Sequence, residues 1–170
     1  MDELVLRLPR EDDASELVRA YRATSPEVPS FLHFYSEGMS LPAYLNLLGH
    51  LKGGTDLPPG CVPETFLFAF VGPRIVGRAA IRHTLNASLE REGGHIGYVV
   101  VPEFRRRGFA TQILALAVRL ANKQLGINPV LVTCDDSNVG SIGVIERNGG
   151  VLRDVVDGRN ERVRRYWIRS

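Results

Sequence analysis

Residues 94–111, which read GHIGYVVVPEFRRRGFAT, constrain the fold more than any other stretch of the chain. The segment from His95 to Val101 is rich in β-branched and aromatic residues and predicts a strand. Pro102 ends it, because proline lacks the N–H that a sheet ladder requires. A turn with Gly108 follows, and an apolar helix is predicted from Thr111. A strand, a turn of small residues and a helix N-terminus in this order offer unpaired backbone N–H groups, which form a cradle for phosphate.

The flanking segments predict further strands and helices around this unit. Gly72-Pro73 and Asp157-Gly158-Arg159-Asn160 mark two antiparallel hairpins. Residues 25–40, 53–63 and 86–94 are predicted as loops. The predicted strands are Leu4 to Leu8, Glu64 to Val71, Arg74 to Leu85, Val130 to Cys134, Val151 to Val156 and Arg162 to Ile168, and the other helices are Ala14 to Ala23, Leu41 to Leu51 and the segment from Asn138 through Asn148.

Length and composition indicate an ordinary globular protein. A chain of 170 residues with 44% hydrophobic residues is expected to form a single domain over residues 1–170. The net charge of +2 implies no general affinity for polyanions, so we expect no nucleic-acid partner. The arginines near the C-terminus alternate with apolar residues, which favours a solvated sheet edge. Two cysteines predict neither a disulfide framework nor a metal site, and no apolar run of about 20 residues predicts a membrane span. A reducing cytoplasm is the expected setting.

Arg105, Gly108 and Ala110 match the Q/R-x-x-G-x-G/A signature of the GNAT acyltransferases. The preceding HIGYVVVPEF resembles the strand that leads into this signature. VTCDDSNVGSIGVIERNGG, residues 132–150, is similar to the Asn-bearing segment that follows the fifth strand of the family. The predicted order of elements resembles the GNAT fold along nearly the whole chain. It implies an α/β (α+β) protein with a mixed, mostly antiparallel sheet of about seven strands, about four flanking helices and a splay between strands 4 and 5. A bacterial subgroup of predicted acetyltransferases is the nearest resemblance.

The resemblance implies acetyl-CoA as co-substrate and no metal. In the family, the turn before the helix holds the pyrophosphate, and the pantetheine arm pairs with the fourth strand at Val99 to Val101. An amide near Val99 would face the thioester carbonyl, while Asn138 would contact the arm and Ser141 lies one helical turn further on. The predicted cofactor-binding residues are therefore Val99, Val100, Val101, Arg105, Arg106, Arg107, Gly108, Phe109, Ala110, Thr111, Asn138 and Ser141.

Transfer of an acyl group to an amine needs a group that accepts the proton of the amine. His95, at the start of the fourth strand, is the first candidate, because imidazole titrates near neutrality. A role in sheet structure alone is the competing interpretation. Glu92 in the adjacent loop is the second candidate. His33, Tyr35 and His83 are further candidates for the acceptor pocket, with structural roles favoured for each.

The sequence departs from the family at the residue that protonates the departing thiolate. Many members carry a tyrosine seven residues after the asparagine, but the corresponding residue here is Ile145. Ser141, Tyr166 or solvent remain as candidates for this role. Cys134 is expected to be a small core residue, because nothing nearby in the sequence would lower the pKa of its thiol.

The sequence thus predicts an N-acetyltransferase that moves an acetyl group from acetyl-CoA to a primary amine by direct attack in a ternary complex. The acceptor is expected to be a small-molecule or peptide amine, and a homodimer is suggested by similar proteins. An acyl-CoA-binding sensor of the same fold with little or no turnover is the alternative, because Ile145 replaces the usual tyrosine. A phosphotransferase lacks support, since no G-x-x-x-x-G-K-[ST] sequence is present.

Overall fold

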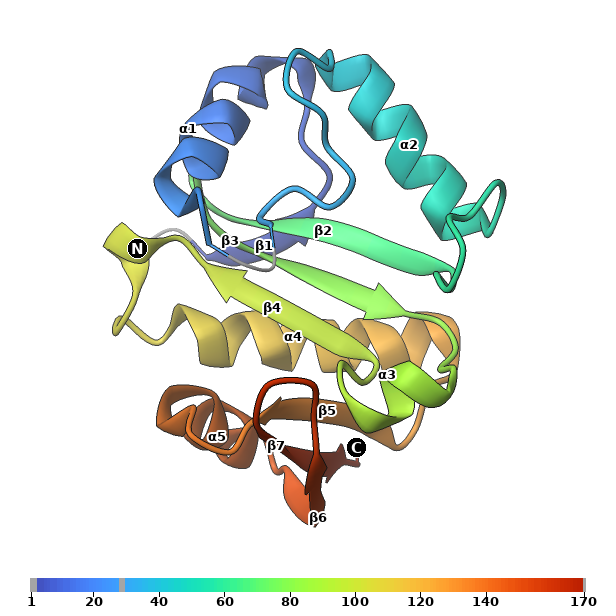
Figure 1. The fold of residues 1–170 in the computed structure, drawn as a ribbon. Coiled ribbons are helices and arrows are strands. Elements are labelled where there is room, and N and C mark those ends of the chain that lie inside the picture. Colours follow the sequence, from blue (N-terminus) through green and yellow to red (C-terminus); the bar gives the residue numbers. More distant parts are fainter. Residues whose placement is uncertain (1–2, 28–29, 170) are drawn as a thin grey trace.

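The computed structural model describes residues 3–27 and 30–169 and contains seven strands in two antiparallel sheets (Figure 1). The first sheet has the order β1-β2-β3-β4, and the second has the order β5-β7-β6. The strands are β1 (Leu4–Arg7), β2 (Glu64–Val71), β3 (Arg74–Arg82), β4 (Ile96–Val100), β5 (Val130–Asp135), β6 (Val151–Asp157) and β7 (Arg162–Ile168). The number of strands and the two hairpins agree with the sequence-based prediction.

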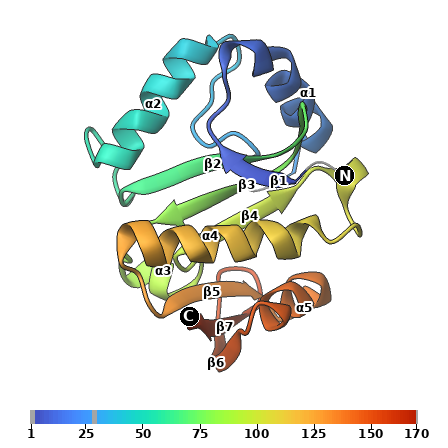
Figure 2. The ribbon, with the colours of Figure 1, turned by 180° about the vertical axis from the view of Figure 1, so that it is seen from behind.

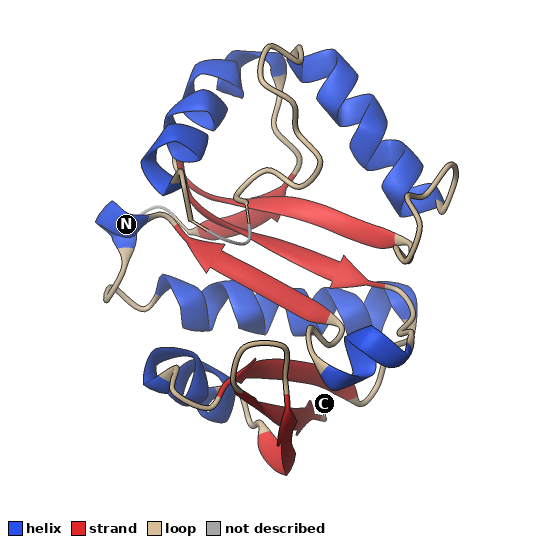
Figure 3. Cartoon of the chain, viewed as in Figure 1, coloured by secondary structure: helices blue, strands red, loops and turns tan. Residues whose placement is uncertain are grey.

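The helices surround the first sheet on both faces (Figures 1 and 2). The helices α1 and α2 cover one face, and α4 crosses the other face, between the two sheets. Colouring by secondary structure makes the layers clear (Figure 3). The α-helices are α1 (Ala14–Thr24), α2 (Leu41–Gly53), α3 (Ala87–Arg91), α4 (Phe109–Leu125) and α5 (Val139–Arg147), and two short 3-10 helices span η1 (Glu11–Asp13) and η2 (Pro102–Phe104).

Two apolar cores form on opposite faces of the first sheet. The α4 stripe of Ile113, Leu114 and Ala117 is fully buried against the sheet, as helical spacing of apolar residues requires. On the other face, Leu17 of α1 and Tyr44 of α2 pack with aromatic side chains of β2. The four-stranded sheet is therefore held between two layers of helix, and β4 is the edge strand on the side of the second sheet.

The two sheets meet at one isolated bridge between Gly94 and Val132. The His95 N–H donates to the Leu131 carbonyl at 2.7 Å, and the Leu131 N–H donates to Nδ1 of His95 at 2.9 Å. Beyond this junction β4 pairs only with β3, so its other edge is open. The splay expected between strands 4 and 5 is thus present.

Some predicted boundaries were wrong. The segment 86–94 is not a loop throughout, because the Asn86 side chain accepts from the Leu89 N–H at 3.0 Å and caps the short helix α3. The predicted strand from Arg74 stops at Arg82. Helix α4 begins before Thr111, since Gly108 takes a φ of +82° and acts as its N-cap. In the predicted loop 25–40, residues 28 and 29 lie outside the described part of the chain.

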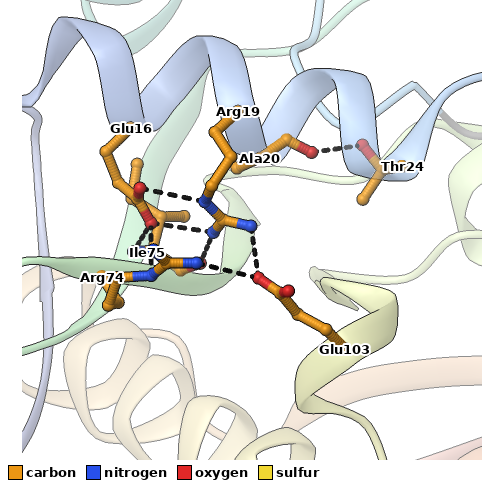
Figure 4. Close-up of polar contacts among 7 residues, drawn as sticks. All are labelled: Glu16, Arg19, Ala20, Thr24, Arg74, Ile75 and Glu103. Atoms are coloured by element: carbon orange, nitrogen blue, oxygen red, sulfur yellow. Dashed lines mark hydrogen bonds and ion pairs between the residues drawn. The ribbon is translucent and has the colours of Figure 1, made fainter.

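An ion-pair network holds the start of the central turn in place (Figure 4). Arg19 of α1 and Arg74 of β3 both contact the carboxylates of Glu16 and Glu103. Glu16 also accepts from the Ile75 N–H at 2.9 Å. Because Glu103 belongs to η2, the network ties the segment that precedes α4 to α1 and to β3.

Candidate active site

A large cavity of about 780 Å³ lies where β4, the N-terminus of α4 and the start of α5 converge. Its walls come from the unpaired edge of β4 on one side and from α5 on the other. Ten of the twelve predicted cofactor-binding residues line it: Val99, Val100, Arg105, Arg106, Gly108, Phe109, Ala110, Thr111, Asn138 and Ser141.

At the α4 end of this cavity the backbone takes an unusual conformation. Arg106 and Gly108 both adopt left-handed backbone conformations, with φ values of +61° and +82°. No side chain caps the α4 N-terminus, and no acidic residue lies in its first turn. The first N–H groups of α4 are therefore available to a ligand, and the positive end of the helix dipole favours an anion.

The charged side chains that line the cavity are mostly cationic. Arg105, Arg106 and Arg147 line the cavity together with one carboxylate, Glu27. Arg105 is held in place rather than free in solvent, since its Nε donates to the Val100 carbonyl at 3.0 Å and its Nη2 to Glu27 at 2.5 Å. This surplus of positive charge suits a ligand with several phosphate groups.

Two predicted cofactor residues lie outside the cavity lining. Val101 is fully buried in the core on the α1 and α2 side, and its N–H donates to the Val76 carbonyl at 2.9 Å. The guanidinium of Arg107 stacks instead over the rings of Phe104 and Phe109, 5.6 Å from each centroid.

The Asn-bearing segment is arranged as a helix cap that faces the cavity. Asn138 Oδ1 accepts from the Ser141 N–H at 3.0 Å, which closes the first turn of α5. Both side chains line the cavity. Ile145 is fully buried, so the position where many relatives carry tyrosine is filled by a core residue.

Tyr98 was not among the predicted site residues, yet it lines the cavity from β4. Its hydroxyl is buried, and within the described residues it has no hydrogen-bond partner. Burial raises the pKa of Tyr98 to about 12, although the Ser141 side chain pulls it downward. A single tyrosine in an otherwise aliphatic strand that leads into the turn signature is the sequence signal that could have pointed to it.

The two predicted proton acceptors lie near the sheet junction and already have partners. Nδ1 of His95 accepts from the Leu131 N–H, so the neutral ring carries its proton on Nε2. Burial lowers the pKa of His95, and the nearby Arg82 lowers it further. Glu92 accepts from the Arg159 N–H at 3.1 Å, at the turn between β6 and β7. Their catalytic roles stay predictions.

Of the two residues predicted to serve the departing thiolate, one lines the cavity and the other does not. Ser141 lines the cavity. Tyr166 is buried between β7 and α5, where its hydroxyl donates to Glu146 at 3.4 Å and does not line the cavity. Burial raises the pKa of the Cys134 thiol to about 11, which agrees with the expected unreactive core residue.

A second, smaller cavity of about 170 Å³ lies on the α2 side of the sheet. Its polar residues are His33, Glu64 and Arg82. Nδ1 of His33 lies 2.9 Å from Glu64, and Arg82 Nε lies 3.9 Å from the same carboxylate. Burial would raise the pKa of Glu64, but the hydrogen bond from His33 and the two nearby arginines, Arg82 and Arg78, hold it below its ordinary value.

The second cavity reaches β4 through Arg82. A Cβ placed on Gly97 would lie 3.8 Å from Arg82 Nη2, so this guanidinium packs over β4 itself. Arg78, four residues before Arg82 on the same face of β3, is 2% exposed, and burial lowers its pKa to about 10. Of the other predicted pocket residues, His83 lies 2.8 Å from the Thr65 hydroxyl and Tyr35 packs on Tyr44, both away from this cavity.

The family model for the acetyltransferase (GNAT) domain matches residues 3–151, so the chain belongs to the GNAT acetyltransferase family. The protein is accordingly an acyltransferase. Enzymes of this family use acetyl-CoA, and no group of three or more potential metal ligands gathers anywhere in residues 3–27 and 30–169. Over the same residues, no helix is long and apolar enough to cross a membrane.

Solved structures of acetyltransferases share the fold. The ribosomal-protein-S5-alanine acetyltransferase of Vibrio fischeri is 13% identical with a TM-score of 0.70, over 99% of this chain and 94% of that chain. The microcin C7 self-immunity acetyltransferase MccE, solved with acetyl-CoA and AMP, is 15% identical with a TM-score of 0.67, over 100% and 94%. The ribosomal L7/L12 alpha-N-protein acetyltransferase RimL, solved with coenzyme A, is 17% identical with a TM-score of 0.66, over 98% and 93%. No curated protein matches the sequence.

The first cavity fits acetyl-CoA in its chemistry. Free N–H groups at the α4 N-terminus and three arginines suit the phosphates. The open edge of β4 offers backbone partners to an extended arm, and the unpartnered Tyr98 hydroxyl offers one more polar contact. The second cavity, on the opposite face of β4, has no comparable main-chain cradle within the described residues.

Proposed function

We propose that this protein is an N-acetyltransferase that moves the acetyl group of acetyl-CoA to a primary amine by direct attack in a ternary complex. The single observation that supports it best is the large cavity bounded by the open β4 edge and the uncapped α4 N-terminus. The acceptor is a small-molecule or peptide amine. A single domain over residues 1–170, a cytoplasmic location and a homodimer stay predictions from the sequence.

The acceptor is proposed to approach β4 from the face opposite to the cofactor. On that face Glu64 is an ionised carboxylate at the wall of the second cavity, and Arg82 joins this cavity to Gly97 of β4. A carboxylate attracts the ammonium form of an amine, and an amine that approaches from this side meets the thioester without crossing the pantetheine arm.

Proton removal from the amine is assigned to His95, with Glu92 as the second candidate. His95 can take the proton only on Nδ1, which means that it gives up its hydrogen bond from the Leu131 N–H. The pKa lowered by burial and by Arg82 keeps the ring neutral near pH 7, which is the form a proton acceptor needs.

Incubation with acetyl-CoA and a panel of amines, with release of free CoA followed over time, tests the proposal. We expect CoA release that depends on both the protein and at least one amine, and an acetylated amine as the second product. Tight CoA binding without turnover across small amines and peptide N-termini would favour a sensor instead. Failure of CoA to bind at all would remove the site assignment.

A further inference from the structure

The leaving group of the reaction is a thiolate, and the usual phenol that serves it is missing from α5. Ile145 fills that position and is fully buried in the core. Tyr166, the other tyrosine considered for this role, has its hydroxyl on Glu146 outside the cavity. The negative charge that develops on sulfur therefore needs a donor from another element.

Tyr98 offers such a donor from β4. It lies opposite Ala79 of β3, and its ring packs in the core between the sheet and α4. Ser141 of α5 lines the same cavity and lies near enough to lower the pKa of Tyr98, although the two side chains form no hydrogen bond of ordinary geometry, so the phenol faces the side of the opening that α5 forms. The hydroxyl thus lies in the gap where the two sheets separate.

The hydroxyl is a buried polar group without a protein partner in the described part of the chain. Such groups are costly in a folded protein and mark places where a ligand or an ordered water supplies the missing contact. Tyr98 lines the cavity proposed for acetyl-CoA, so a ligand in that cavity comes within reach of it.

The position of Tyr98 along the cavity indicates which part of the ligand it meets. The phosphate cradle at Arg106 to Thr111 lies beyond the C-terminal end of β4, whereas the sheets close at Gly94 and His95 near its N-terminal end. An extended arm that starts at the cradle and follows β4 brings its far end, which carries the sulfur, to the closed end of the opening. Tyr98 is the middle residue of β4, so such an arm passes it on the way from the cradle to the closed end.

We propose that the Tyr98 hydroxyl donates a hydrogen bond to the sulfur of bound coenzyme A and stabilises the departing thiolate without giving up its proton. The inference rests on the proposed function. In the reaction the amine nitrogen forms a bond to the acyl carbon, the carbon–sulfur bond breaks, and its electron pair goes to the sulfur. The proton lost by the amine returns to the thiolate through solvent, and Tyr98 begins and ends the cycle protonated.

The relative acidity of the Tyr98 phenol and of a thiol decides whether the phenol only donates a hydrogen bond or transfers its proton to the sulfur. Burial raises the pKa of Tyr98 to about 12. An ordinary thiol has a pKa of about 8.5, so a thiolate is too weak a base to remove the proton of this phenol. A hydrogen bond from a neutral donor to a charged acceptor remains strong in a site that excludes water.

The test uses coenzyme A alone and needs no acceptor. The ultraviolet absorbance of the thiolate is titrated for CoA bound to the wild type and to Tyr98→Phe. We expect the pKa of the bound thiol to be higher by about one unit in the variant, a change of about tenfold, because the thiolate loses a charge-assisted hydrogen bond. Tyr44→Phe is the matched control, since Tyr44 is also buried with an unpartnered hydroxyl but lies on α2, away from the cavity.

An unchanged thiol pKa in Tyr98→Phe, with CoA still bound, would overturn the inference and leave the proposed function intact. If the wild type binds no CoA, the proposed function and the inference both fail. Should the Phe variant not fold or bind, 3-fluorotyrosine at position 98 keeps the shape and makes the phenol a stronger donor. We then expect the pKa of the bound thiol to fall below the wild-type value, and no fall would contradict the proposal.

Discussion

The two faces of β4 are built in different ways. On the α4 face, most of the cavity lining comes from one stretch, within residues 98–111, which ends in the uncapped N–H groups of α4, and α5 completes it. On the α2 face, the smaller cavity depends on charged side chains from distant segments, with His33 from a loop, Glu64 from β2 and Arg82 from β3. Backbone N–H donors suit a ligand group that is the same in every relative, such as phosphate, whereas side chains can select one acceptor over another.

This difference separates two tasks. The α4 face is suited to a cofactor common to the whole family, since free helix N–H groups bind any phosphate. The α2 face carries the buried Glu64 and Arg78 together with the partly buried Arg82, and each buried charge needs a partner. Changes on one face should therefore alter cofactor affinity, and changes on the other should alter acceptor use.

The largest expected effect comes from Gly108→Trp on the cofactor face. The indole would fill the cradle, and the φ of +82° disfavours any side chain. We expect calorimetry to show acetyl-CoA affinity reduced by at least about 100-fold, since the phosphate contacts supply a large share of the binding free energy. Gly126→Trp is the matched control, because Gly126 caps the other end of α4 with a φ of +66° and open space around it. Equal losses in both variants would contradict a specific cradle.

A smaller effect is expected from Glu64→Gln on the acceptor face. The substitution keeps the size of the side chain but removes the charge that attracts the ammonium. We expect kcat/KM for the best amine of the panel to fall by about tenfold, with the Kd for acetyl-CoA unchanged. Asp154→Asn serves as the control, because Asp154 is also paired with an arginine, at 2.6 Å, but lies on β6, outside both cavities. A loss of cofactor affinity in Glu64→Gln would break the division between the faces.

His95 lies beside the bridge that joins the two sheets. Its variants test whether it accepts a proton in the reaction or only stabilises this junction. His95→Ala leaves the Leu131 N–H without its acceptor, so the free energy of unfolding should fall by about 1–3 kcal/mol in chemical denaturation. His95→Gln restores an acceptor oxygen. If His95 is the proton acceptor, His95→Gln regains much of the stability but not the turnover. Recovery of both would assign His95 to structure alone.

The smallest effect is a dependence of stability on pH. Because the folded-state pKa of His95 is lowered, the unfolded chain takes up the proton first as the pH falls. The neutral ring makes its full contribution to the free energy of unfolding above the unfolded-state pKa of about 6.5. This contribution declines as the pH falls from there to the folded-state pKa. We expect denaturation midpoints measured between about pH 7 and pH 5 to fall less steeply in His95→Gln than in the wild type.

The sequence was most informative where the site is local. The turn before α4 and the pair Asn138 and Ser141 line one cavity, and their local geometry follows from spacing within one turn, while their binding of the cofactor stays a prediction. The contact between His33 and Glu64 could not be predicted, since it requires a loop and a strand 31 residues apart to come together. The sequence nevertheless holds a signal for a buried charged cluster on this face. Arg78 interrupts an apolar segment of β3, and the residues on either side of it are buried. From the sequence, Tyr98 indicates only a strand. The role of its hydroxyl becomes visible once the structure shows that Tyr98 lines the cavity.

Gly94 has a consequence for how this enzyme can diversify. A Cβ at this position would lie 2.5 Å from the Leu131 carbonyl oxygen, so no larger residue fits without forcing the two sheets apart. The spacing at the closed end of the opening is thus fixed by the absence of a side chain. New acyl donors or acceptors have to be accommodated by exchanging side chains along the walls, and a wider separation of the strands is not open to a single substitution that preserves the junction.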